Sequence, residues 1–431
     1  MVDLSTKLGP LTLKNPIVAG GGPTAGTVDH IKNCVDSGMG GVVTKTTSTV
    51  WYLQRYPRPL YKLVDYKKDP EHPYDDPKDY FWMHREHNSC FRPMQFVEII
   101  REVAPYCKEH NCKLIGNFSC RNLEEWEQVG KAYEDAGCDA LELNFCCPFP
   151  PEGLAKSEED NKIGIYYTKN PGEAVKVLEL LSKKVSLPLF VKMSPDGLDF
   201  AKVAKMMEAA GAAGVTMFAN NKTMRVDIET GQPVIYGPGP GTGTGMKPIT
   251  MRWVSEVAEA CELSVMASRG AVTWEDCIEF MMSGADAVQY CSPIMIRGLR
   301  YVKELLKGIE EYMERKNYQS IEEIKDIALK QIYSNKDLVE KVKPLFAVMN
   351  HKKCVGCKRC VHSCWYDAIT VHKKAVINKE CCSGCSLCSQ VCPTSAIYMQ
   401  EREDDLSHFQ AMAHAHPHLA PEDFFPEGVK K

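Results

Sequence analysis

Cysteine is concentrated in one stretch near the C-terminal end of the chain, between residues 354 and 392. The stretch contains two runs in which successive cysteines are separated by two, two and three residues. This spacing is typical of two [4Fe–4S] clusters, each held by three cysteines of one run and the fourth cysteine of the other. The ligands predicted for cluster 1 are Cys354, Cys357, Cys360 and Cys392. The ligands predicted for cluster 2 are Cys382, Cys385, Cys388 and Cys364.

Structural zinc sites are the alternative interpretation of these cysteines. A zinc ribbon pairs two Cys-x-x-Cys knuckles and requires neither the third nor the fourth cysteine of each run. The complete spacing therefore favours clusters. Trp365 follows the first run where Pro393 follows the second. This difference affects the local turn and not the ligands.

A second candidate for chemistry is the segment Glu142-Leu-Asn144-Phe-Cys146-Cys147-Pro148-Phe149. It ends an apolar, strand-like run. A thiol of ordinary pKa is mostly protonated at neutral pH and can donate a proton to a carbon centre, which makes Cys147 a candidate general acid. A buried, inert cysteine is the alternative. Polar residues end several other strand-like runs and favour a site: Thr44-Lys45-Thr46, Lys192, Asn220-Asn221, Ser268-Arg269-Gly270 and Cys291-Ser292.

The elements that would position these residues are eight short apolar runs, each followed by an amphipathic, helix-like segment. Near-continuous apolar runs are typical of strands buried on both faces. The predicted strands are Ile17–Gly22, Gly41–Thr47, Lys113–Ser119, Ala140–Phe145, Pro188–Ser194, Gly214–Asn220, Leu263–Arg269 and Ala287–Ser292. Eight such units predict an α/β fold, a (β/α)8 TIM barrel with its site at the carboxyl ends of the strands. A doubly wound sheet is the competing fold.

Two long segments interrupt this alternation on the expected catalytic face. One covers residues 50–93 and is rich in aromatic residues, and the other covers 221–247. Long loops in a compact domain are usually lids or binding loops. A surface that packs against a partner is the alternative for the first segment.

The domain organisation expected from these patterns has four parts. Residues 1–315 form the barrel, with its insertion at 50–93, and residues 316–347 form a helical connector. Residues 348–400 form a small α+β, ferredoxin-like domain with two clusters. The charged tail, 401–431, contains His408, His414, His416 and His418. A solvated tail or an arm that wraps a partner is favoured over a metal-binding tract.

Charge and composition narrow the class of protein. The formal net charge of −4 argues against a nucleic-acid partner. We expect no membrane span, because no apolar run approaches the length of a bilayer crossing. With no export signal, the scattered cysteines fit reduced thiols in a cytoplasmic protein.

Several motifs together resemble one known group of enzymes. They are Leu8-Gly-Pro-Leu-Thr-Leu-Lys-Asn-Pro-Ile17, Thr44-Lys45-Thr46, Asn144-x-x-Cys147-Pro148, Lys247-Pro248-Ile249 and Ser320-Ile-Glu-Glu-Ile324. With these motifs the chain resembles the dihydroorotate dehydrogenase superfamily, and most closely the FMN and iron–sulfur portion of dihydropyrimidine dehydrogenases. The resemblance covers nearly all of residues 4–398, with the barrel before the ferredoxin-like domain.

The resemblance implies specific roles for residues at the strand ends. FMN would be bound by Gly20, Lys45, Thr46, Asn117, Lys192, Asn220, Gly243, Arg269, Gly270, Cys291 and Ser292. The substrate would contact Asn88, Asn144, Phe149 and Asn221. The implied reaction is reduction, or oxidation in reverse, of a C–C bond next to a carbonyl, with hydride from FMN N5 and a proton from Cys147.

The source of electrons is expected to lie outside this chain. The glycine-rich run Gly237–Gly245 lacks the strand-then-helix context of a dinucleotide-binding motif. A FAD- and NAD(P)-binding partner subunit, or ferredoxin, is therefore the expected electron donor, and we expect an oligomer.

Three departures from the superfamily pattern keep two alternatives open. Phe149 stands where a polar residue is usual, and Glu86-His87-Asn88-Ser89-Cys90 replaces a polar substrate segment. Arg269 stands where the first Gly of a Gly-Gly pair is usual. Overall similarity favours a pyrimidine, uracil or thymine, as the substrate, whereas Phe149 and the aromatic insertion favour a non-pyrimidine, enone-type substrate. An electron-transfer subunit of a larger redox complex is the alternative from another class.

Overall fold

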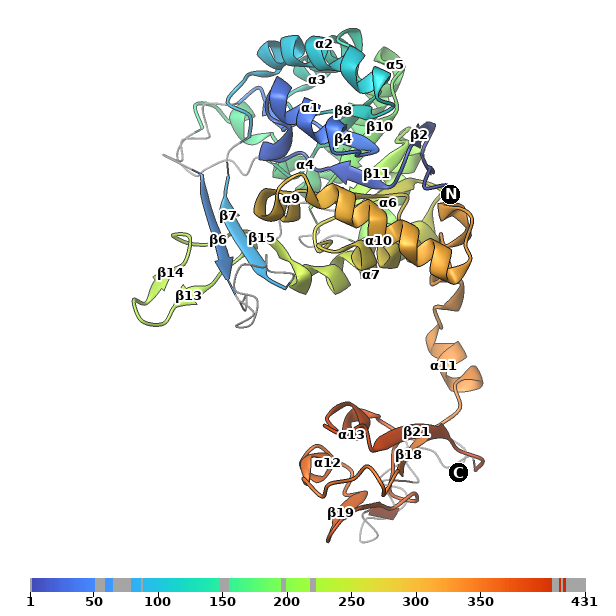
Figure 1. Ribbon diagram of the computed structural model, residues 1–431. Helices are drawn as coiled ribbons and strands as arrows, with labels where there is room; N and C mark the ends of the chain where they lie inside the picture. Colours follow the sequence, from blue (N-terminus) through green and yellow to red (C-terminus); the bar gives the residue numbers. More distant parts are fainter. Residues whose placement is uncertain are drawn as a thin grey trace. The chain divides into compact units, whose positions relative to one another are not determined.

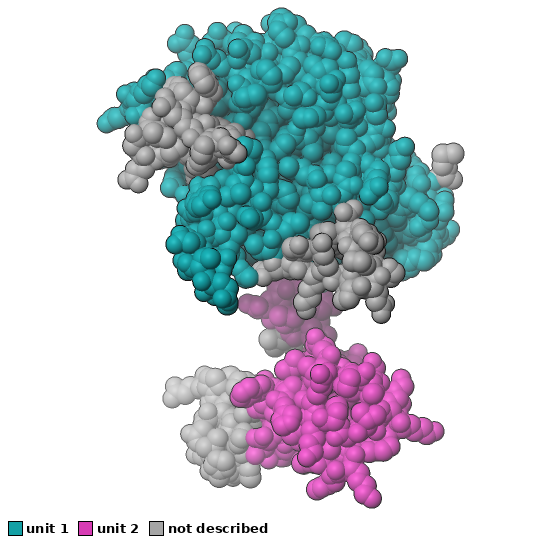
Figure 2. Space-filling model, turned by 60° about the vertical axis from the view of Figure 1, so that its left-hand side comes forward, with its two compact units in different colours: residues 1–331 teal, residues 332–431 magenta. Residues whose placement is uncertain are grey.

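The computed structural model describes residues 2–50, 59–64, 79–86, 88–147, 155–194, 199–217, 222–404, 411 and 414–415. The chain divides into two compact units, Met1–Gln331 and Ile332–Lys431, which are coloured separately in Figure 2. The first unit extends beyond residue 315, where the barrel was expected to end. Backbone hydrogen bonds explain this extension, because the amides of Asp326 and Ala328 donate to the carbonyls of Met281 and Met282.

A closed barrel of parallel strands forms the centre of the first unit (Figure 1). Each strand pairs with the next, and β17 pairs with β3 to close the ring. Among the described residues the barrel strands are β3 (Ile17–Ala19), β4 (Gly41–Val43), β8 (Lys113–Ser119), β9 (Ala140–Asn144), β10 (Leu189–Lys192), β11 (Gly214–Met217), β16 (Ser264–Ser268) and β17 (Ala287–Tyr290). The short β5 (Thr47–Ser48) adds to β8. The predicted TIM barrel is confirmed.

Amphipathic helices cover the outside of the barrel. They are α1 (Val28–Asp36), α2 (Pro93–Glu109), α3 (Leu123–Asp135), α4 (Ile165–Lys169), α5 (Pro171–Lys184), α6 (Phe200–Ala209), α7 (Lys247–Ala260), α8 (Trp274–Met282), α9 (Ser292–Arg297) and α10 (Tyr301–Lys316). The amphipathic pattern of Pro293–Arg315 predicts one helix after the last barrel strand, but the structure has two, so this prediction is wrong. Gly298 has φ +77°, a left-handed conformation that glycine adopts readily, and it separates the short α9 from α10.

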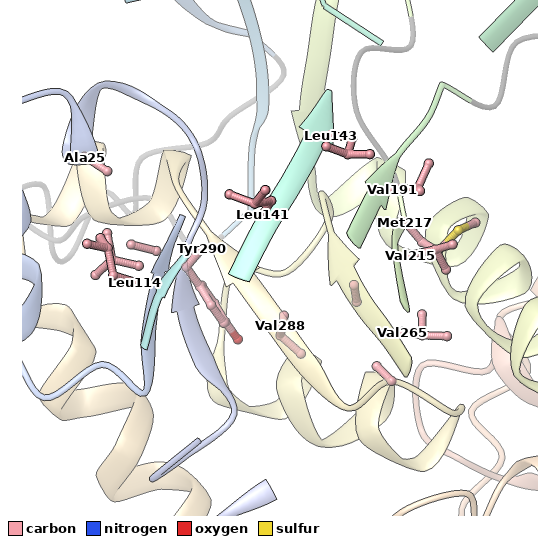
Figure 3. Packing of buried hydrophobic residues seen from close by; sticks show 14 of the residues in the cluster. Ala25, Leu114, Leu141, Leu143, Val191, Val215, Met217, Val265, Val288 and Tyr290 are labelled. Carbon is pink, nitrogen blue, oxygen red and sulfur yellow. The ribbon is translucent and has the colours of Figure 1, made fainter. Parts of the chain in front are cut away.

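Alternation along the strands sorts their side chains into two cores. Residues that point outward pack against the helices, and Figure 3 labels Leu141, Val191 and Val288 among the buried side chains of this core. A separate apolar cluster includes residues at alternate positions, such as Phe190 and Met266. Leu8 and Leu13 belong to the same cluster. They come from the hairpin of β1 (Thr6–Leu8) and β2 (Leu11–Leu13). The strand positions beyond this cluster, toward the carboxyl ends, carry polar residues, and these form the site described below.

The two long interruptions of the barrel pattern join in one antiparallel sheet, which we call the lid sheet. Its strands, in order, are β12 (Lys222–Thr223), β15 (Gly239–Gly243), β7 (Phe81–Arg85) and β6 (Leu60–Val64). Figure 1 shows β6, β7 and β15 side by side. A small hairpin of β13 (Val226–Asp227) and β14 (Gln232–Pro233) lies between β12 and β15 in the sequence.

The second unit repeats one arrangement of loop and short helix. Strand β18 (Leu345–Met349) pairs with β21 (Ile397–Glu401), and β19 (Ile369–Val371) pairs with β20 (Ala375–Ile377). Helices α12 (Arg359–His362) and α13 (Leu387–Gln390) each contain the third cysteine of a run. Helix α11 (Asn335–Lys341) precedes them. The predicted small α+β, ferredoxin-like domain is confirmed.

Candidate active site and cluster-binding loops

A buried carboxylate organises the polar layer inside the barrel. Glu142 on β9 is fully buried. Its Oε1 accepts hydrogen bonds from Asn117 Nδ2 on β8 and, at 3.2 Å, from Lys192 Nζ on β10. Its Oε2 accepts from Thr216 Oγ1 at 2.6 Å and from Gln289 Nε2 at 2.9 Å. Donors from four other strands therefore converge on one side chain.

This network fixes the position of Lys192. Its ammonium group donates to Glu142 and, at 3.1 Å, to Gln289 Oε1. Lys192 is 7% exposed, so its charge is balanced by the carboxylate and not by water. The sequence pattern predicts Lys192 as a site residue but not Glu142 or Gln289. The available signal was a charged residue within the apolar run Ala140-Leu-Glu-Leu.

Replacing Glu142 with Met is expected to lower the free energy of unfolding by about 3–5 kcal/mol, because it leaves Lys192 as an unpaired buried charge. Urea unfolding followed by tryptophan fluorescence measures this change. Glu311 forms an exposed salt bridge with Lys307 and provides the control. The change Glu311→Met should cost less than about 0.5 kcal/mol. Equal stability of the two variants would contradict the role given to Glu142.

The turn that contains Cys147 is held by Asn144. The amide oxygen of Asn144 accepts from the backbone N–H groups of Cys146 and Cys147 at 3.2 and 2.9 Å, and from Cys146 Sγ at 2.8 Å. Its amide nitrogen donates to Thr46 Oγ1 and Asn117 Oδ1 at 2.9 and 3.3 Å. Asn144 is 2% exposed, so these contacts give it a positioning role. A substrate contact by Asn144 remains a prediction.

The two neighbouring thiols have opposite pKa shifts. Their sulfurs lie 3.7 Å apart. The hydrogen bond from Cys146, together with the positive charges of Lys192, Arg269 and Lys45, lowers the pKa of Cys147 below its ordinary value. Burial raises the pKa of Cys146. Cys147 is partly exposed, whereas Cys146 is buried. Cys147 is thus the more acidic and the more accessible of the two thiols.

The predicted FMN residues within the described chain lie at or near the carboxyl ends of the barrel strands, except Gly243, which ends β15 in the lid sheet. Gly20 follows β3, and Lys45 and Thr46 follow β4. Arg269 and Gly270 follow β16, and Cys291 and Ser292 follow β17. Asn117 and Lys192 are strand residues. Asn220, Asn221 and Phe149 lie outside the described residues.

Contacts from the barrel to the lid sheet involve two of these predicted residues. Lys45 forms a salt bridge with Glu86, which directly follows β7. Arg269 has φ +79°, and its guanidinium donates to the carbonyl of Gly241 on β15. The side chain that replaces the usual glycine therefore reaches the lid sheet. Asn88 follows Glu86 by two residues, in the segment that leads from the lid sheet to α2.

One residue of the lid sheet that sequence reasoning missed is His84 on β7. Its Nδ1 is buried and has no hydrogen-bond partner among the described residues. Burial, with the positive charges of Arg269 and Lys45, lowers the pKa of His84 to about 3. The imidazole is therefore neutral at physiological pH. Its electrostatic coupling to Arg269 and Lys45 places it near the barrel mouth.

Tyr61 on β6 lies near both His84 and Trp82 of β7. The rings of Tyr61 and His84 lie 6.4 Å apart, and those of Tyr61 and Trp82 lie 5.1 Å apart. Tyr80 directly precedes β7, and its hydroxyl lies 3.2 Å from Ser292 Oγ at the start of α9. These contacts connect the aromatic side chains to the loop after β17. We call Tyr61, Tyr80, Trp82 and His84 the aromatic lid.

In the second unit, the eight predicted ligand cysteines line two separate cavities. One is lined by the four cysteines predicted for cluster 1: Cys354, Cys357, Cys360 and Cys392. The other is lined by the four predicted for cluster 2: Cys364, Cys382, Cys385 and Cys388. Each cavity thus takes three cysteines from one run and the fourth from the other.

Backbone N–H groups point at sulfurs of both sets. The amides of Ala375 and Ala396 lie 3.5 and 3.2 Å from the sulfurs of Cys354 and Cys392. The amide of Ala347 lies 3.4 Å from Cys382 Sγ. Such donors stabilise the negative charge of a thiolate. Within the described residues, no three or more His, Cys, Asp or Glu side chains converge as a single metal ion requires.

Two models of known protein families match the sequence of this chain, one in each unit. A dihydroorotate dehydrogenase family model matches residues 91–313. The chain belongs to this family. A model of the 4Fe–4S dicluster domain matches residues 347–399, which contain both cysteine runs.

One named relative aligns with most of the chain, and two others align with about half of it. The NAD-dependent dihydropyrimidine dehydrogenase subunit PreA of Escherichia coli K12 is 25% identical over 373 residues, covering 84% of this chain and 85% of the relative. The catalytic subunit of dihydroorotate dehydrogenase B (NAD+) from Alkaliphilus metalliredigens is 30% identical over 229 residues, or 53% of this chain and 72% of the relative. That of Geobacillus kaustophilus is 33% identical over 193 residues, or 44% and 58%.

Membership of the dihydroorotate dehydrogenase family defines the cofactors and the class of reaction. The chain is a flavin- and iron–sulfur-dependent oxidoreductase of the dehydrogenase family that acts on CH–CH groups, with FMN in the barrel and [4Fe–4S] clusters in the second unit. None of the helices in the described parts of the chain has the length and apolar character needed to cross a membrane.

The barrel mouth has features that fit FMN. Gly270 has φ +88°, and a Cβ there would strike the backbone of Lys247, so only glycine leaves this loop intact. The loops after strands 7 and 8 and a short extra helix are the usual phosphate site of this fold, and α9 is such a helix. Lys45 and Lys192 supply positive charge at the ends of β4 and β10.

Proposed function

We propose that this chain reduces a carbon–carbon double bond conjugated to a carbonyl, or oxidises the product in reverse, and that Cys147 is the general acid. The observation that carries this proposal is the acidified, partly exposed thiol of Cys147 beside the positive charges of Lys45, Lys192 and Arg269. A proton donor and a cationic cluster at one barrel mouth suit the protonation of one carbon while hydride adds to its neighbour.

The roles of the chain's own residues follow from their contacts. When bound, reduced FMN supplies the hydride. Lys192, held by Glu142 and Gln289, places a fixed positive charge where the flavin ring is proposed to lie. Asn144 holds the Cys147 turn, so the thiol keeps one orientation. The remaining predicted FMN and substrate residues keep the roles given above as part of this proposal.

The first substrate candidate is a pyrimidine such as uracil, reduced to its 5,6-dihydro form. It is supported by the relative named as a dihydropyrimidine dehydrogenase subunit, which aligns with 84% of this chain. A non-pyrimidine enone is the second candidate. The neutral imidazole of His84, whose buried Nδ1 has no hydrogen-bond partner among the described residues, and the rings of Tyr61 and Trp82 favour it, because they offer a hydrogen-bonding nitrogen beside aromatic surface.

Replacing His84 with Phe is expected to raise KM about 10-fold or more with a smaller change in kcat, because the variant lacks the nitrogen that would bind a substrate oxygen. His84→Asn retains one amide donor and should recover part of the affinity. Initial rates at varied substrate concentration measure both values. An unchanged KM in His84→Phe would remove His84 from the substrate site.

We also infer that the two cysteine sets ligate the clusters in the crossed pattern and that electrons pass through them one at a time. A redox partner must then supply electrons, either a FAD- and NAD(P)-binding subunit or a one-electron carrier such as ferredoxin. The relative from Escherichia coli is itself named as a subunit, which supports a partner and an oligomer.

One experiment tests the proposed activity directly. The protein, purified anaerobically with FMN and clusters, is reduced and mixed with uracil, and in parallel with cyclic and acyclic enones. Flavin reoxidation with formation of the dihydro product identifies the acceptor. If no conjugated carbonyl compound reoxidises the flavin, the proposal fails in favour of an electron-transfer subunit.

A further inference from the structure

Six exposed cations lie in or beside the loop of the proposed cluster 1. We call them the basic rim: Lys352, Lys353, Lys358, Arg359, Lys373 and Lys374. Between residues 351 and 375 the only acidic residue is Asp367, although the whole chain has a net charge of −4. The positive charge of this segment is therefore a local feature.

Contacts between the two stretches bring the basic rim together in space. Lys358 and Arg359 line the same cavity as the four cysteines of cluster 1. A Cβ on Gly356 would strike the carbonyl of Lys373, so residues 356 and 373 are in close contact. Lys374 Nζ donates to the carbonyl of His351. The β19–β20 turn thus lies against the cysteine loop and adds its two lysines to the same patch.

The charge of the basic rim is not balanced within the described part of the chain. None of its six side chains forms a salt bridge with an acidic residue that the structure describes, whereas Lys343 and Lys379 of the same unit pair with Glu401 and Asp404. The second cysteine run differs sharply, because residues 381–396 contain no charged side chain. Among the described residues, the cations beside the second run, Lys379 and Arg402, pair with Asp404, whereas the basic rim beside the first run has no acidic partner.

An apolar residue and an accessible ligand lie within this patch. Val355 is 66% exposed, and Cys357 is the exposed cysteine of the first run. An exposed apolar centre inside a polar rim is the usual anatomy of a protein interface. The loop therefore combines charge for attraction with an exposed residue among the proposed ligands of cluster 1.

We propose that the basic rim is the docking surface for an acidic one-electron carrier protein of the ferredoxin class, which exchanges electrons with cluster 1. The inference rests on the proposed function. It specifies which of the two proposed partners supplies electrons and which cluster receives them. Each docking oxidises the carrier by one electron and reduces cluster 1 by one, so two dockings and two protons accompany each reduced double bond. Complementary charge accelerates association of such partners by about 10–10³-fold.

The test reverses charge at three positions whose side chains make no hydrogen bond or salt bridge with the residues that the structure describes, and it leaves Lys358, Arg359 and Lys374 intact. The variant is Lys352→Glu, Lys353→Glu and Lys373→Glu in the holoenzyme. Its control is Lys303→Glu, Lys307→Glu and Lys316→Glu on α10, which has the same change in net charge. A small acidic two-[4Fe–4S] ferredoxin is the probe. Stopped-flow absorbance gives the rate constant of cluster reduction, and calorimetry gives the Kd of the oxidised carrier.

We expect the rim variant to be reduced about 10-fold or more slowly than wild type at 50 mM salt and to bind the carrier about 10-fold or more weakly. The α10 control should behave as wild type, and the difference should shrink as salt screens the charges. Equal rates and equal Kd values in all three proteins would overturn the proposal.

A light-generated deazariboflavin radical, an uncharged one-electron donor, separates this inference from the proposed function. It should drive turnover equally in all three proteins. Absence of turnover with this donor would count against the proposed function alone, because the Kd of the oxidised carrier still decides whether the basic rim is a docking surface.

Discussion

Cys147→Ala is expected to lower turnover by about 10²–10⁴-fold while FMN remains bound, the usual size of a general acid's contribution. The thiol is the partly exposed member of a cysteine pair, and its pKa is lowered by Cys146 and by neighbouring cations. Steady-state rates and the flavin absorbance spectrum measure the two properties. Cys277 on α8 is buried and supplies the control, since Cys277→Ala should retain activity.

The pH profile of the same variants gives a second readout. Only the protonated thiol can donate a proton, so the reduction rate should fall as pH rises through the pKa of Cys147. Because that pKa is lowered, the fall should occur below the pH expected for an ordinary cysteine, whose pKa is about 8.5. Cys147→Ser should lose this step. Full activity in Cys147→Ala, with an unchanged profile, would contradict the assignment.

The crossed ligation predicts which cluster each cysteine variant disrupts. Cys392→Ser should perturb the same cluster as Cys354→Ser, although the two residues belong to different runs. Cys364→Ser should perturb the same cluster as Cys382→Ser. Each variant should lose about half of the iron and nearly all turnover that depends on a one-electron carrier. Iron analysis and the electron paramagnetic resonance spectra of the reduced proteins measure these effects.

Cys381 provides the matched control for this series. It is the ninth cysteine of the unit, lines neither cavity, and accepts a hydrogen bond from Asn378 Nδ2 at 3.1 Å. Cys381→Ser should keep both clusters. If Cys392→Ser altered the signal that Cys382→Ser alters, the ligands would follow the runs and the crossed pattern would be wrong.

Local patterns predicted the barrel strands and the cysteine cavities because both depend on short-range sequence. Each barrel strand is a short apolar run, and each cluster loop is set by fixed spacing. The break at Gly298 was missed because a single glycine can continue a helix or end it, and only its φ of +77° decides.

Contacts between segments that are distant in the sequence could not be predicted from local sequence patterns. The lid sheet pairs β7 with the glycine-rich β15. Neither segment contains a pattern that predicts this pairing or its register, in which Met83 lies opposite Gly241. The role of Glu142 could not be predicted from its own segment, because the four groups that donate hydrogen bonds to it come from four other strands. His84 was missed for the same reason, because the burial of its Nδ1 without a hydrogen-bond partner among the described residues depends on how the lid sheet packs.

The central claim is that a two-electron flavin site and one-electron clusters work together in this chain. The most direct measurement counts product in a single turnover of fully reduced holoenzyme with an excess of the acceptor that reoxidises its flavin. Two electrons on FMN and one on each cluster predict about two molecules of dihydro product per chain. About one molecule per chain, with the clusters still reduced, would contradict the claim.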